Sequence, residues 1–165
     1  MIALRVVEVG EFMTLLLAKN TFDKFYLCEG RAETFTSFQF GGKLNKEYYT
    51  PDEWELLENR EYPYWGEVRP FVYQVIRGKK LPVNFKLIFS LSRKNTDWLI
   101  SHVQTGLYVQ DVRNLFLNIH YEKKGVTCIT GTSLTNFTMD KTVEELWDQT
   151  AEKFFKQNKI AVERI

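Results

Sequence analysis

A wide apolar stripe near the C-terminus constrains the fold more than any other feature. Between Thr142 and Phe155 apolar residues recur at steps of three and four, which is the period of an amphipathic helix. The stripe consists of Val143, Leu146, Trp147, Thr150, Ala151, Phe154 and Phe155. Thr142 and Glu145 have the spacing of a capping box, which predicts a helix that Thr142 caps. So wide a stripe has to be buried, and we expect it to lie on a sheet.

Alternating segments predict the strands of that sheet. Residues 83–92 alternate apolar and polar positions, and residues 115–122 do the same, as half-buried strands do. A tight connection at Lys123-Lys124-Gly125 leads from the second segment to residues 126–132, which predicts a hairpin. Further strands are expected at residues 3–9, 23–31, 34–40 and 136–139. Helices are expected at residues 11–19, 50–60, 68–77 and 95–104.

Strands joined by hairpins, with helices between the groups, predict an α+β fold in which helices cover an antiparallel sheet and the C-terminal amphipathic helix packs on it. The order strand, helix, strand, strand occurs over residues 4–41 and again over residues 86–131, so two such repeats are a hypothesis. The chain has 165 residues and no Pro/Gly/Ser-rich linker, so we expect a single globular domain over residues 1–165.

The composition excludes some classes of function. There are 22 basic and 21 acidic residues, a net charge of +1, which argues against a global nucleic-acid or anionic-membrane footprint. The two cysteines, Cys28 and Cys128, lie far apart and are expected to be two buried thiols, with a disulfide or a redox pair as the alternative. With no signal peptide and no apolar run of span length, we expect a cytoplasmic protein that does not enter a membrane. The absence of clustered Cys and His predicts no metal and no cofactor.

Two segments have the residue types of a binding surface. Aromatic side chains and an arginine crowd residues 62–71, and such residues are enriched in binding hot spots and stack on bases. A basic run follows at residues 77–80. The candidate partner-binding residues are Tyr62, Tyr64, Trp65, Arg69, Arg77, Lys79 and Lys80. The alternative is structural: the aromatics fix a loop on the core, Arg69 pairs with a carboxylate such as Glu67, and the basic run is a solvated turn.

An enzyme is a further alternative, and Cys128 with His120 is its best candidate pair. If the hairpin brings the two residues together on adjacent strands, the imidazole could activate the thiol as a nucleophile. The alternation of residues 126–130 also allows Cys128 to point into the core. We therefore assign no catalytic residue.

Three segments carry a resemblance to a known family: residues 42–49 (GKLNKEYY), residues 62–71 (YPYWGEVRPF) and residues 130–134 (TGTSL). The chain resembles a family of uncharacterised bacterial proteins, mostly from clostridia, known only as a domain of unknown function. This resemblance implies no chemistry. The order of elements also resembles one domain of a DNA sliding clamp, which implies a clamp-like fold.

The predicted function is that of a non-enzymatic binding or interaction domain, and we expect its partner to be a protein. A nucleic-acid-associated, clamp-like module is the second hypothesis. It requires Arg77, Lys79, Lys80, Arg93 and Lys94 to gather on one face. A small-molecule enzyme that uses Cys128 and His120 is the third.

Weak nucleic-acid binding follows from the charge balance. Electrostatic affinity scales with the number of phosphates neutralised, so we expect dissociation constants weaker than about 10 μM at about 150 mM salt. Fluorescence anisotropy with duplex and single-stranded DNA across a salt series measures this. Submicromolar binding that is lost when Arg77, Lys79 and Lys80 are replaced by alanine would contradict the expectation.

Overall fold

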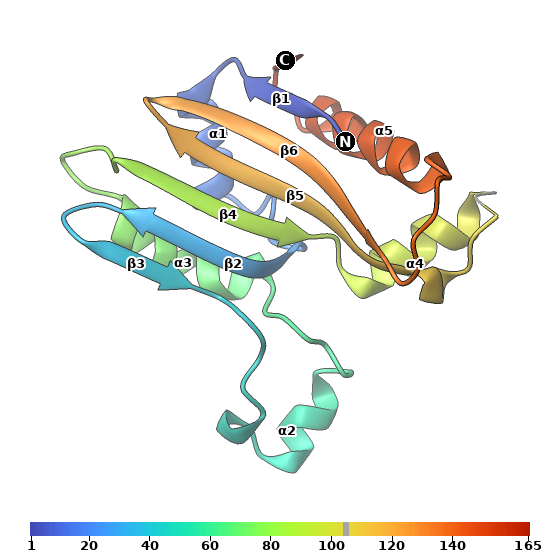
Figure 1. Ribbon diagram of the computed structural model, residues 1–165. Helices are drawn as coiled ribbons and strands as arrows, with labels where there is room; N and C mark the ends of the chain where they lie inside the picture. Colours follow the sequence, from blue (N-terminus) through green and yellow to red (C-terminus); the bar gives the residue numbers. More distant parts are fainter. Residues whose placement is uncertain (104–105) are drawn as a thin grey trace.

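The computed structural model describes residues 1–103 and 106–165. Its strands are β1 (Ala3–Val6), β2 (Tyr26–Glu33), β3 (Ser37–Phe40), β4 (Asn84–Ser90), β5 (Val112–Glu122), β6 (Gly125–Leu134) and β7 (Val162–Arg164). Its helices are α1 (Val9–Leu17), α2 (Pro51–Leu56), α3 (Trp65–Ile76), α4 (Arg93–His102) and α5 (Thr142–Gln157), with short 3-10 helices η1 (Lys46–Tyr48) and η2 (Val109–Asp111). The strands form one antiparallel sheet in the order β3-β2-β4-β5-β6-β1-β7, and Figure 1 shows this order from β3 to β1.

The predicted hairpin is confirmed and forms the centre of the sheet. β5 and β6 pair from Val112 opposite Leu134 to Glu122 opposite Gly125. The turn residues Lys123 and Lys124 have φ values of 49° and 63°, which are the left-handed angles of a two-residue type I′ turn. The sheet alternates as expected, because every second side chain is buried over residues 85–89, 115–121 and 126–130.

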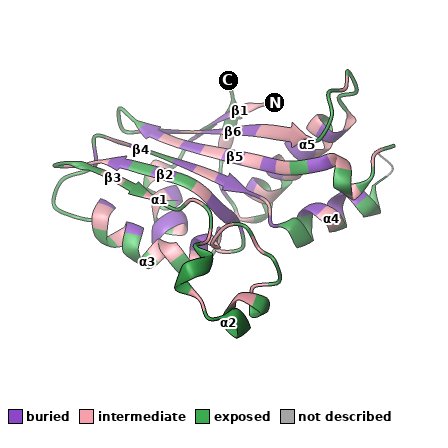
Figure 2. Ribbon diagram, turned by 60° about the horizontal axis from the view of Figure 1, so that its bottom comes forward, coloured by how far each residue is buried: buried purple, intermediate pink, exposed green. Residues whose placement is uncertain are grey.

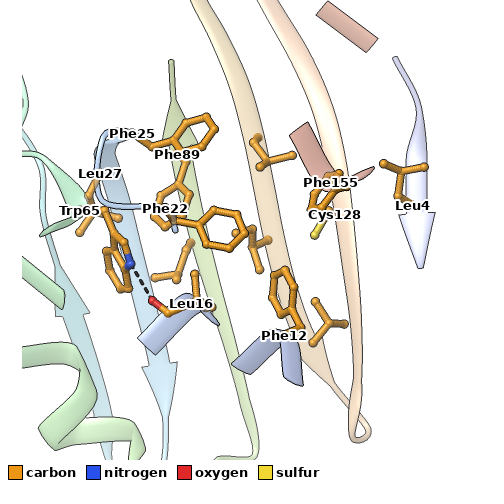
Figure 3. Close-up of a cluster of buried hydrophobic side chains, with 14 of the residues drawn as sticks. Leu4, Phe12, Leu16, Phe22, Phe25, Leu27, Trp65, Phe89, Cys128 and Phe155 are labelled. Carbon is orange, nitrogen blue, oxygen red and sulfur yellow. Dashed lines mark hydrogen bonds between the residues drawn. The ribbon is translucent and has the colours of Figure 1, made fainter. Parts of the chain in front are cut away.

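Helices α1, α3 and α5 lie on the same side of the sheet, which fixes where the core forms (Figures 1 and 2). Phe22, in the loop before β2, is fully buried between these layers. Its ring lies 5.6 Å from that of Phe12 in α1, 6.0 Å from that of Phe89 in β4 and 5.4 Å from that of Phe154 in α5. One aromatic side chain thus joins two helices to the sheet (Figure 3).

The C-terminal helix packs on the sheet as predicted. Val143, Trp147, Ala151 and Phe155 are buried, and the Trp147 indole N–H donates to the Phe116 carbonyl oxygen at 2.8 Å. The predicted cap is wrong in detail. Thr142 is the first helical residue, and its backbone N–H donates to the Asp140 carboxylate at 2.8 Å.

Other boundaries differ because tertiary contacts override local pattern. Residues 136–139 form no strand, and the short edge strand β7 was not predicted. Helix α3 begins at Trp65, although residues 61–67 look irregular in the sequence. The Glu67 carboxylate accepts from the Tyr64 N–H at 2.8 Å and so extends the helix toward the N-terminus. The predicted end of α4 at residue 104 lies outside the described residues.

The order strand, helix, strand, strand does occur twice, as β1-α1-β2-β3 and β4-α4-β5-β6. The strand pairing differs between the two units. β4 pairs with β5 of its own unit, whereas β1 pairs with β6 of the other unit. The two units therefore share an order of elements but not a pattern of hydrogen bonding.

Residues 41–63 leave the sheet and return to it, and we call this segment the arm. It contains η1 and α2, neither of which has a buried residue. Helix α2 begins with a capping box, in which Thr50 and Glu53 each accept from the backbone N–H of the other, at 3.2 Å and 2.9 Å. Figure 1 shows α2 standing away from the sheet.

Replacing Trp147 by alanine should destabilise the protein strongly. The change leaves a cavity and removes a donor from the Phe116 carbonyl, so we expect a loss of about 3–5 kcal/mol of unfolding free energy. Urea denaturation measures it. Lys153→Ala, at an exposed position of the same helix, is the control and should change stability by less than about 0.5 kcal/mol. Equal midpoints for both variants would contradict the packing described.

Candidate functional site

The second face of the sheet carries no helix among the described residues (Figure 2). Side chains on this face alternate with the buried ones, because successive residues of a strand point to opposite faces. They form a half-exposed surface of mixed character that includes Glu29, Arg31, Lys86, Ile88, Phe116, Asn118, His120 and Thr127. We call this surface the open face.

A hollow of about 700 Å³ lies on the open face across β2, β4 and β5. We call it the central hollow. Its lining residues are Glu29, Arg31, Glu33, Thr34, Val83, Asn84, Lys86, Ile88 and His120. Strand register sets the geometry: Arg31 is opposite Lys86, and Lys86 is opposite His120. Directly opposed side chains have Cβ atoms about 4.5–5.5 Å apart, so three nitrogen-bearing side chains stand in one row.

The charged groups of the central hollow are unequally satisfied. Arg31 donates to Glu33 at 2.9 Å, and the Ser37 hydroxyl donates to the same carboxylate at 2.6 Å. The Ser37 hydrogen bond, followed by that of Arg31, lowers the pKa of Glu33. The side chains of Lys86, His120 and Glu29 make no hydrogen bond or ion pair with any described residue. The hollow therefore offers an unpaired ammonium, imidazole and carboxylate.

A second pocket of about 600 Å³ lies where the arm returns to the sheet. We call it the arm pocket. It is lined by Tyr26, Glu58, Asn59, Arg60, Glu61, Tyr62, Leu91, Arg93, Arg113, Asn114 and Ser133. Two of its arginines have structural partners. Arg93 donates to the Val112 carbonyl at 2.7 Å, and Arg60 pairs with Glu67. Asn114 in the arm pocket and His120 in the central hollow lie on the same face of β5, about 20 Å apart at 3.4 Å per residue. We call the strip of the open face between these two pockets the track.

The candidate residues of the 62–71 segment have separate positions. Trp65 is fully buried, and its indole N–H donates to the Leu16 carbonyl at 2.9 Å, so it is unavailable to a partner. Arg69 donates from Nε and Nη2 to the Asp23 carboxylate at 2.8 Å and 2.9 Å. Its partner is thus Asp23 rather than Glu67. This hydrogen bond raises the pKa of Arg69.

The tyrosines of that segment remain accessible in part. Tyr64 packs on the ring of Tyr26 at 5.3 Å and under the guanidinium of Arg60 at 4.3 Å. Tyr62 lines the arm pocket. Burial raises the pKa of the Tyr62 phenol, and the nearby Glu61 adds to the effect. Of the segment, Tyr62 is therefore the residue best placed to meet a ligand.

The basic run at residues 77–80 lies at the other end of α3 from the two tyrosines and does not form one surface with them. Arg77, Lys79 and Lys80 follow the last turn of α3, whereas Tyr62 and Tyr64 precede its first turn. A helix of 12 residues is about 18 Å long. The proposed clamp-like basic face is also not formed, because Arg93 is engaged with backbone carbonyls beyond the opposite end of β4.

The pair Cys128 and His120 is excluded as a catalytic dyad. Cys128 is fully buried on the helix-covered face, and burial raises the pKa of its thiol to about 12. His120 is on the open face, opposite Thr127. The sheet itself separates the thiol from the imidazole. Cys28 and Cys128 are both free thiols, and the prediction that both are buried is wrong for Cys28, which is only partly buried.

Neither a cluster of metal-binding side chains nor a membrane-spanning helix is found in the described residues. Within residues 1–103 and 106–165, no three His, Cys, Asp or Glu side chains are placed to hold a metal ion. In the same ranges, no helix has the length and apolar character needed to cross a bilayer.

Fold and site define an α+β domain whose single sheet is covered by helices on one face. A model of a family of unknown function, DUF5721, matches residues 15–163. The chain therefore belongs to this family, and the predicted membership of an uncharacterised family is confirmed. No curated protein and no solved structure matched the chain. The clostridial source and the clamp likeness stay predictions.

The sequence pattern alone does not identify Glu29, Arg31 and Lys86 as site residues. Each occupies a polar position of an alternating strand, and that pattern identifies the face but not a hollow. Which polar residues meet depends on the strand order β2-β4-β5, which brings together residues more than 30 positions apart.

Removing Arg69 should cost stability rather than binding. Arg69→Ala leaves the partly buried Asp23 carboxylate unpaired, so we expect a loss of about 1.5–3 kcal/mol of unfolding free energy. A double-mutant cycle with Asp23→Ala measures the coupling, which should exceed about 0.5 kcal/mol. Arg113→Ala is the control, because Arg113 is exposed and has no side-chain partner among the described residues. If the losses of unfolding free energy of the two single variants simply add up in the double variant, the assigned ion pair of Arg69 and Asp23 is contradicted.

Proposed function

We propose that this protein is a non-enzymatic binding domain that holds a carboxylate-bearing partner segment on the open face of its sheet. The observation that carries the proposal is the central hollow, where Lys86 and His120 stand opposite each other on adjacent strands and are unpaired within the described chain. Burying polar groups against a ligand is favourable only when they gain partners. An acidic group satisfies both side chains.

The shape of the surface supports an extended partner. The track from the arm pocket to the central hollow follows β5 for about 20 Å, which is the length of about six extended residues. Phe116 and Ile88 supply half-exposed apolar area along it. Glu29, on the other side of the hollow, is free to accept from a backbone or side-chain N–H. These features favour a protein segment, in line with the expected protein partner.

The chemistry of the hollow supports binding rather than catalysis. A nucleophile needs a base within hydrogen-bond reach, and the only thiol near His120 in sequence lies on the other face of the sheet. The free thiols also favour a reducing compartment. We therefore propose a cytoplasmic binding module, and the family resemblance supports a bacterial source.

Binding should depend on Lys86 and His120. Two probes separate the possible sources of the carboxylate: succinate, and an acetylated hexapeptide of alternating Glu and Ala. In two-dimensional amide NMR titrations we expect shifts on β2, β4 and β5, with the peptide also shifting residues near Phe116 and binding more tightly. Lys86→Ala with His120→Ala should weaken binding by about tenfold or more, since a charged hydrogen bond contributes about 1.5–3 kcal/mol.

Lys94→Ala is the control for that experiment, because Lys94 is an exposed lysine on α4 outside the hollow. It should bind both probes as the parent does. Shifts confined to other surfaces, or equal affinity of the parent and the double variant, would refute the proposed site. Tighter binding of succinate than of the peptide would assign the hollow to a small molecule.

A further inference from the structure

A third depression lies at the end of the molecule where the β2–β3 turn meets the connection from α3 to β4. We call it the end groove. It has a volume of about 490 Å³ and is lined by Thr34, Phe35, Gln74, Val75, Ile76, Arg77, Gly78, Lys80, Leu81 and Val83. Three of its apolar side chains are largely exposed: Phe35 at 92%, Leu81 at 67% and Val83 at 67%. Such clustered apolar exposure is typical of interaction sites.

The rim of the end groove is basic. Arg77, Lys79 and Lys80 are exposed, and none has an ion pair with a carboxylate of the described chain. Arg77 stacks over the ring of Tyr73 at 5.5 Å, which leaves its charge uncompensated. The Thr34 hydroxyl oxygen is buried beside the groove and has no hydrogen-bond partner among the described residues. The groove therefore combines apolar lining, positive charge and an unsatisfied hydroxyl.

The arm complements the end groove, because it is acidic and carries an exposed apolar side chain. Residues 43–61 contain six carboxylates against three cations, a net charge of −3. Leu56 at its tip is 81% exposed and lies between the exposed carboxylates of Glu55 and Glu58. The arm keeps its own shape, because the ring of Trp54 packs on that of Tyr49 at 5.7 Å and the capping box fixes the start of α2. The arm thus presents an exposed leucine, flanked by carboxylates, in a fixed conformation.

We infer that the end groove of one copy of this chain receives the arm tip of a second copy. Leu56 enters among Phe35, Leu81 and Val83, while Glu55 and Glu58 face the basic rim. Charge complementarity selects this occupant, since opposite potentials favour the correct partner and speed encounter. The inference is independent of the ligand proposed for the open face.

The position of the two surfaces determines the kind of assembly. The arm returns to the fold before the first turn of α3, and the end groove begins at the last turn of the same helix. Figure 1 shows the arm and the α3–β4 connection well apart. A contact between two different surfaces is heterologous, so each added copy leaves one free arm and one free groove. Association should therefore be head-to-tail and continue with concentration.

Sedimentation velocity of the full chain from about 10 μM to about 500 μM tests the inference. We expect the weight-average sedimentation coefficient of the parent to rise with concentration, and the rise to be suppressed at about 0.5 M salt, which screens exposed charges. Two variants block one surface each: Lys79→Glu with Lys80→Glu in the groove, and Glu55→Gln with Glu58→Gln on the arm, where neutral replacements do not attract the reversed groove. Each variant alone should remain monomeric across the range.

The decisive measurement is the equimolar mixture of the two variants. The groove variant keeps an intact arm and the arm variant keeps an intact groove, so the mixture should form a dimer and nothing larger. Lys94→Glu with Lys153→Glu changes the net charge as the groove variant does and should associate like the parent. A monomeric parent at the highest concentration, a groove variant that still associates, or a mixture that stays monomeric would each overturn the inference. A monomeric parent would leave the end groove to a different acidic partner.

Discussion

The buried hydrogen bond from the Trp65 indole to the Leu16 carbonyl fixes the relation between α1 and α3. The ring of Trp65 also lies 5.1 Å from that of Phe89 in β4, so one side chain holds both helices against the sheet (Figure 3). Trp65 is the first residue of α3. Its anchoring therefore sets where the arm rejoins the fold and, one helix length away, where the end groove forms.

One-sided burial is the second constraint. Apolar side chains of β4, β5 and β6 fill one face, and α1, α3 and α5 cover it. These three helices cover only that face, and the opposite face leaves polar side chains such as Lys86 and His120 accessible in the central hollow. Lys86 and His120 remain unpaired there because their cross-strand neighbours are Arg31 and Thr127, neither of which is an acid. The open face owes its binding character to this register.

The local sequence pattern predicted the structure correctly in segments whose hydrophobic period itself determines which side chains are buried. The stripe of α5 and the alternation of β4 and β5 are local features, and both were predicted correctly. Pattern failed for Trp65 and Arg69, which have the composition of a binding hot spot. Only the fold shows that Trp65 fills the core and that Arg69 has a carboxylate partner, Asp23, 46 positions away.

The sequence by itself determined the α+β class, the antiparallel hairpin, the amphipathic C-terminal helix and the family, because these depend on periodicity and on residues close together in the chain. The tertiary structure decided which polar residues meet. It set Lys86 beside His120, separated His120 from Cys128 across the sheet, and parted Tyr62 from Lys80 by the length of α3. These relations depend on strand order and on the faces of the sheet, which arise from contacts between distant segments and leave no mark on local spacing.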